Sequence, residues 1–103
     1  KKAELNGNVN QLSELVYQEI SRHKIYPYMA KRQRREGLVK LSFVLHPDGL
    51  VSDVIIIQSS QFAVLDRAAQ KAVKGISPFL IAADYLSYRR SFDVNVDFRL
   101  GKI

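Results

Sequence analysis

The amino-acid sequence predicts an α+β domain in which two helices pack on one face of a three-stranded antiparallel sheet. Three observations lead to this prediction. Two stretches carry apolar residues at helical spacing, two segments rich in β-forming residues flank a tight-turn sequence, and the last segment alternates between apolar and polar residues. The 103 residues are 47% hydrophobic and 25% charged, which is typical of one globular domain.

The first helix is predicted to begin at Val9. Basic residues at 22–24 suit the end of this helix, where the helix dipole favours positive charge, and Pro27 prevents a simple continuation. We therefore expect residues 1–8 to be a flexible lead-in and residues 9–103 to form the domain. The apolar stripe of the helix consists of Val9, Leu12, Leu15, Val16 and Ile20.

A β-hairpin is predicted in the middle of the chain, after a short helical turn at residues 29–33. Residues 38–45 and 50–58 are rich in β-forming residues. The sequence His-Pro-Asp-Gly at residues 46–49 joins them, and Gly49 can adopt the positive φ that such a turn requires. The two segments are therefore expected to pair as antiparallel strands.

The second helix is expected to follow Ser59 and Ser60, which end the hairpin and are suited to cap a helix. Gly75 and Pro78 are expected to end this helix, and a loop then leads to residue 88. The apolar positions at helical spacing are Phe62, Leu65, Ala69, Ala72, Val73 and Ile76.

The last strand shows the clearest alternation in the chain. A strand of this kind has one buried and one exposed face. A three-stranded sheet also has two edges, whose unpaired N–H and C=O groups either need protection by charged side chains or bind an additional strand. The apolar set is Phe92, Val94, Val96, Phe98 and Leu100, and the polar set is Ser91, Asp93, Asn95, Asp97 and Arg99.

Catalytic and metal-binding motifs are not found in this sequence. There is no cysteine and no glycine-rich phosphate loop, and the two histidines, His23 and His46, are far apart. Next to a turn, His46 is expected to form local hydrogen bonds rather than to act as a general base. We therefore expect no enzyme, and no catalytic, metal-binding or cofactor-binding residues.

The net charge of +6 favours acidic partners, nucleic acid or anionic lipid. The one dense basic run is Lys-Arg-Gln-Arg-Arg at residues 31–35, and no aromatic residue is interleaved to stack on bases. A solvated basic surface is therefore expected. A small nucleic-acid-binding domain is the alternative.

Several short motifs occur in an order and spacing that resemble the C-terminal domain of TonB over about residues 9–100. They are Tyr26-Pro27, Ala30, Glu36-Gly37-Leu38-Val39, Pro47-Asp48-Gly49, Val51, Val54, Ser59-Ser60, Leu65-Asp66-Arg67-Ala68-Ala69, Ala72-Val73, Pro78-Phe79 and a closing strand that ends in Phe98.

This resemblance implies a periplasmic adaptor that has no cofactor. TonB proteins couple the proton-motive force of the inner membrane to uptake of iron-siderophore, haem or cobalamin across the outer membrane of Gram-negative bacteria. An N-terminal membrane helix, which would precede this chain, anchors them to the inner membrane and meets ExbB and ExbD. The C-terminal domain binds the TonB box, a short peptide of an outer-membrane receptor, as a strand beside its own last strand.

The resemblance also implies which residues bind the box. The family often carries Gln-Pro-x-Tyr-Pro after its first helix, but His23 and Lys24 stand here in place of Gln and Pro, so the contact made by that glutamine is not implied. The implied peptide-binding residues are Arg90, Ser91, Phe92, Asp93, Val94, Asn95, Val96, Asp97, Phe98 and Arg99, with auxiliary contacts from His23, Lys24, Ile25, Tyr26 and Pro27.

A TolA-like domain or a TonB paralogue that serves another periplasmic partner is the closest alternative. Strand exchange between exposed edges would also permit a homodimer.

Overall fold

The computed structural model describes residues 9–101. The predicted order of helix, hairpin, helix and strand is confirmed, whereas the predicted lead-in at residues 1–8 lies outside the described residues. The elements are α1 (Val9–His23), α2 (Tyr28–Arg32), β1 (Gly37–Leu45), β2 (Val51–Gln58), α3 (Ala63–Gly75), the 3-10 helix η2 (Leu80–Asp84) and β3 (Arg90–Phe98).

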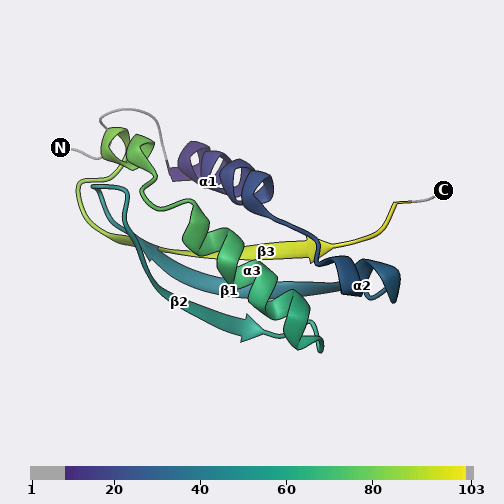
Figure 1. Cartoon of the computed structure of the whole chain (residues 1–103). Helices are drawn as coiled ribbons and strands as arrows, with labels where there is room; N and C mark the ends of the chain where they lie inside the picture. The colour runs from purple at the N-terminus through teal and green to yellow at the C-terminus, as the bar shows by residue number, and fades with distance from the viewer. Residues whose placement is uncertain (1–8, 102–103) are drawn as a thin grey trace.

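The three strands form one antiparallel sheet in the order β2-β1-β3. β3 pairs with β1 along its whole length, from Phe98 opposite Gly37 to Arg90 opposite Leu45. The pairing of β1 with β2 contains two register shifts. Figure 1 shows β1 between the other two strands, with α1 and α3 on the same face of the sheet, so the predicted fold class is confirmed. Within residues 9–101, the outer edges of β2 and β3 are unpaired.

The core lies between this face of the sheet and the two long helices. Within it, the ring of Phe43 stacks on that of Phe92, with 5.8 Å between the ring centroids. The inward positions of β3 are the predicted ones, and Leu100 follows the end of the strand and is half-buried. The buried side chains of the strands are Val39, Leu41, Phe43, Leu45, Phe92, Val94, Val96 and Phe98, and those of the helices include Leu12, Val16, Ile20, Leu65, Ala69, Ala72 and Val73.

The turn between β1 and β2 requires glycine. Gly49 has a φ of +93°, and a Cβ atom there would lie 2.7 Å from the carbonyl oxygen of Phe79. The Phe79 amide also donates to the Gly49 carbonyl oxygen, at 2.8 Å. The predicted turn is thus confirmed, and it docks on the segment before η2. The ring of His46 lies 2.8 Å from the Ser52 hydroxyl through its Nε2 atom, which is the local contact expected of it.

The segment that was expected to be a loop up to residue 88 contains η2. Ala82 of this short helix is fully buried, so packing stabilises a turn that five residues are too few to reveal by periodicity.

The expected cap at Ser59 and Ser60 is a second correction, because the N-cap residue of α3 is Phe62 and has no side-chain cap. Both serines instead donate hydroxyl hydrogen bonds to the Asp66 carboxylate, at 2.5 and 2.8 Å, and the Ser60 amide donates a third at 2.9 Å. Burial raises the pKa of Asp66, but these three bonds outweigh it and hold the pKa below its ordinary value. The Asp66 carboxylate thus ties the end of β2 to α3.

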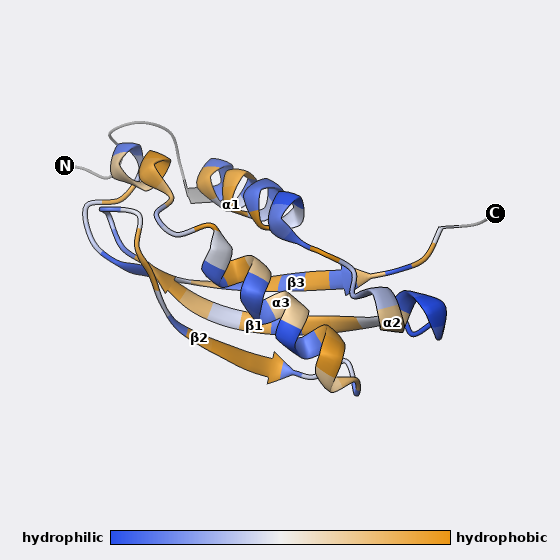
Figure 2. Cartoon of the chain, in the orientation of Figure 1, coloured by the Kyte–Doolittle hydropathy of each residue, from blue (hydrophilic) through white to orange (hydrophobic). Residues whose placement is uncertain are grey.

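The uncovered face of the sheet is not uniformly polar. Figure 2 shows that β2 is largely hydrophobic, and Ile55 and Ile57 on this strand are 57% and 52% exposed. Within residues 9–101, no helix is long and apolar enough to cross a membrane.

Candidate functional site

The outer flank of β3, which faces away from β1, presents the main-chain groups of alternate residues. In an antiparallel pair, successive residues direct their N–H and C=O groups to opposite flanks of the strand. The Leu100 amide turns toward the β1 side, where it donates to the Glu36 carboxylate at 2.8 Å, and the Asp97 carbonyl oxygen accepts from the Lys24 ammonium at 2.5 Å. These contacts place the outward groups at Ser91, Asp93, Asn95 and Asp97.

Most of these outward groups have no partner within the described part of the chain. Among residues 9–101, the bond from Lys24 to Asp97 is the one hydrogen bond seen on this flank. It lies at the end of the strand. The N–H and C=O groups of Ser91, Asp93 and Asn95 therefore have no hydrogen-bond partner among residues 9–101.

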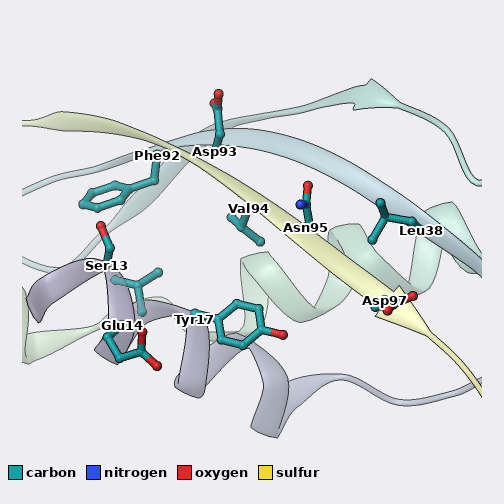
Figure 3. Close-up of a pocket in the computed structure, with 10 residues that line it drawn as sticks. Ser13, Glu14, Tyr17, Leu38, Phe92, Asp93, Val94, Asn95 and Asp97 are labelled. Atoms are coloured by element: carbon teal, nitrogen blue, oxygen red, sulfur yellow. The ribbon is translucent and has the colours of Figure 1, made fainter. Parts of the chain in front are cut away.

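A groove of about 450 Å³ follows this flank, and α1 forms its other wall. Figure 3 shows Phe92 and Val94 pointing toward α1, whereas Asp93 and Asn95 point away from it. A strand added to β3 would therefore direct alternate side chains toward α1 and toward the uncovered face of the sheet. The lining residues are Ser13, Glu14, Val16, Tyr17, Leu38, Phe92, Asp93, Val94, Asn95 and Asp97.

This groove is acidic, although the chain as a whole is basic. Among residues 9–101, its lining includes the carboxylates of Glu14, Asp93 and Asp97 and no Lys, Arg or His. One oxygen of the Asp97 carboxylate accepts from Arg99 Nε at 2.8 Å, and the other is buried without a partner among residues 9–101. The Arg99 side chain lies just beyond the strand, so its positive charge offsets the negative charge of the groove at one end only.

Lys24 and Tyr26, from the segment after α1, reach the end of β3. The Tyr26 ring meets Phe98 edge-on, with 5.4 Å between the centroids, and its hydroxyl donates to the Arg35 carbonyl oxygen. Burial, and then the Glu36 carboxylate, raise the pKa of Tyr26. The Lys24 ammonium, which donates to the Asp97 carbonyl oxygen, also lies 5.5 Å from the centroid of the Phe98 ring. Two of the five predicted auxiliary residues thus contact β3.

The other three auxiliary residues, His23, Ile25 and Pro27, line a second groove of about 560 Å³ against α3. His23 Nε2 lies 3.2 Å from the Glu19 carboxylate, on its own helix. The structure therefore divides the predicted auxiliary segment between two places. On the α3 side this second groove is lined by Val64, Arg67, Ala68, Lys71 and Gly75.

The predicted residues of the last strand do not all line the first groove. Arg90 is exposed at the start of β3, and Val96 and Phe98 are part of the core. The wall formed by α1 was not predicted from the sequence, because the apolar positions of a helix do not indicate which strand edge the helix will lie beside. The α1 residues that were missed in this way are Ser13, Glu14, Val16 and Tyr17, and Leu38 of β1 is a further lining residue that was not predicted.

The basic run at residues 31–35 lies at the end of α2, apart from both grooves. All of its side chains are exposed, and Figure 2 shows this end of the molecule as strongly hydrophilic. The Arg35 guanidinium lies over the Phe62 ring, 4.9 Å from its centroid. Within residues 9–101, no group of His, Cys, Asp or Glu side chains is placed to hold a metal ion.

Comparison with known proteins supplies a family for this arrangement. The family described as "Gram-negative bacterial TonB protein C-terminal" matches residues 22–100. Protein TonB of Pasteurella multocida is 35% identical over 77 residues, which are 75% of this chain and 30% of that protein. The chain thus spans under a third of the length of this relative.

Solved structures share the fold. The solution structure of the Helicobacter pylori TonB C-terminal domain (residues 179-285) matches with a TM-score of 0.79 and 25% identity, over 94% of this chain and 88% of that one. TolAIII bound to a peptide derived from the N-terminus of TolB matches with a TM-score of 0.59 and 20% identity, over 85% of this chain and 74% of that one. At that identity, the second likeness concerns the fold alone.

Proposed function

The chain belongs to the family of Gram-negative bacterial TonB C-terminal domains, and on this premise we propose that it is the receptor-binding domain of a periplasmic energy transducer. It binds the TonB box of outer-membrane receptors as a fourth strand against the outer flank of β3. The observation that carries this proposal is the row of outward main-chain groups at Ser91, Asp93 and Asn95, which lie along a groove and have no partner within residues 9–101.

Strand addition accounts for both affinity and breadth of recognition. About six main-chain hydrogen bonds, at roughly 0.5–1.5 kcal/mol net each, supply several kcal/mol before the cost of ordering the peptide. Main-chain groups are the same in every peptide, so one domain serves receptors whose boxes differ in sequence.

The same geometry suits the transmission of force. The hydrogen bonds between an added strand and β3 run across the strands in either orientation of the peptide, so a pull along the strand direction loads many of them together. We propose that the part of the protein before this chain anchors it in the inner membrane and contacts ExbB and ExbD. Work derived from the proton-motive force then reaches the receptor and drives uptake of iron-siderophore, haem or cobalamin.

An NMR titration of the chain with receptor box peptides tests this proposal. We expect chemical-shift changes along residues 90–100 and around Tyr26, because the peptide pairs with β3 and its end lies near the Tyr26 ring. A box peptide with the same composition in scrambled order serves as the control and is expected to bind more weakly. Shifts confined to the basic run at residues 31–35 would contradict strand addition at β3.

A further inference from the structure

We propose that the docked peptide carries a lysine or arginine at the position that pairs with Asp93, and that the groove selects against an acidic residue there. This inference rests on the proposed function, since it concerns the peptide bound at β3. It names the chemistry of the preferred peptide, which main-chain pairing alone leaves open.

Asp93 is the carboxylate best placed to contact the peptide side chain at this position. Paired residues on neighbouring strands share a face of the sheet, and neighbouring strands lie about 4.7–4.9 Å apart. The Asp93 side chain is exposed, points away from α1 in Figure 3, and forms no ion pair or hydrogen bond with the described residues. By contrast, Asp97 is already paired with Arg99, and its carbonyl oxygen accepts from Lys24.

The neighbours of Asp93 within the sheet leave its charge largely uncompensated. On β1 its partner is Ser42, which is neutral. Lys40 lies opposite Asn95 on the same face, diagonal to Asp93, where strands place side chains roughly 7–8 Å apart. No ion pair joins Lys40 to Asp93 in the described part of the chain. A cation on an added strand would therefore lie closer to Asp93 than Lys40 does.

Peptide residues on either side of this position would point toward α1. There they meet the ring of Tyr17, which is 48% exposed, together with Val16 and Phe92. These surfaces favour apolar side chains, and the Glu14 carboxylate at the same wall again favours a cation over an anion. The preferred peptide thus alternates apolar, basic and apolar residues along the groove.

The net charge of +6 favours the opposite preference, because at long range it attracts acidic peptides. The two effects differ in range. Salt at about 0.15 M screens exposed charges beyond roughly 8 Å, so the directly paired carboxylate is expected to decide the preference under those conditions.

Three peptides that are identical except for Lys, Gln or Glu at the position paired with Asp93 test this inference by titration calorimetry. Cross-peaks between the peptide and the Asp93 amide first establish the register of pairing. We expect the Lys peptide to bind roughly three- to tenfold more tightly than the Glu peptide, with the Gln peptide between them. In Asp93→Lys the order of the three peptides is expected to reverse.

Asp84→Lys is the matched control. It makes the same change in net charge at an exposed position in η2, outside the groove, and is expected to preserve the preference for the Lys peptide. If Asp84→Lys reverses the order as Asp93→Lys does, the effect is long-range and the inference is wrong. Equal affinities for the three peptides, with shifts still along β3, would overturn the inference and leave the proposed function intact. Absence of shifts along β3 with every peptide would overturn the proposed function itself.

Discussion

Asn95→Pro is expected to weaken binding of a receptor peptide at least tenfold while the domain remains folded. The Asn95 amide lies on the outer flank of β3, so proline removes a donor that the sheet itself does not use. Its ring also occupies the space where the added strand would approach, which costs more than the one hydrogen bond. The preceding Val94 is already extended, as a residue before proline must be. Peptide titration calorimetry measures the loss.

Asn95→Ala is the control for this substitution, because it removes the side chain and keeps the main-chain donor. We expect it to bind the peptide within about twofold of the parent chain, in line with the small effects of surface substitutions. Circular dichroism would establish that both variants are folded. A folded Asn95→Pro variant with unchanged affinity would place the peptide elsewhere.

Phe43→Ala is expected to lower the free energy of unfolding by about 3–5 kcal/mol, the usual cost of deleting a buried aromatic side chain. Phe43 lies on the central strand β1 and is 0% exposed. Its loss leaves a cavity beneath Phe92, on which it stacks. Because a domain is typically stable by only about 5–15 kcal/mol, this is a large share of the total. Urea unfolding followed by circular dichroism measures the change.

Ile57→Ala serves as the stability control, since Ile57 is 52% exposed on the uncovered face of the sheet. Its truncation is expected to cost much less than that of Phe43, about 1 kcal/mol, because about half of its surface stays in water and no closed cavity forms. Equal losses in the two variants would contradict the placement of Phe43 in the core and of Ile57 at the surface.

Periodicity predicted most of the fold because each long element exposes only one side. The alternation at Phe92, Val94 and Val96 identified β3 and its inward face, and the positive φ at Gly49 followed from the turn sequence. Such patterns depend on residues that are close in sequence, so they can be recognised without a structure.

The composition of the groove could not be predicted in this way. Lys24 and Asp97 are separated by 73 positions, and their contact depends on how α1 ends above the sheet. The sequence pattern places Tyr17 and Glu14 on the solvent-exposed side of a helix, and this is correct. The same side of the helix also borders the edge of β3. Contacts of this kind depend on how distant segments pack together, and no local sequence pattern indicates them.

Amide hydrogen exchange along β3 tests the central claim most directly. In the free chain, Val94 and Val96 donate into the ladder with β1 and are expected to exchange slowly, whereas Asp93 and Asn95 face the open flank and are expected to exchange fast. A saturating receptor peptide should slow the second pair and remove this alternation. Equal protection of all four amides in the free chain, or unchanged exchange of Asp93 and Asn95 in the complex, would contradict the account.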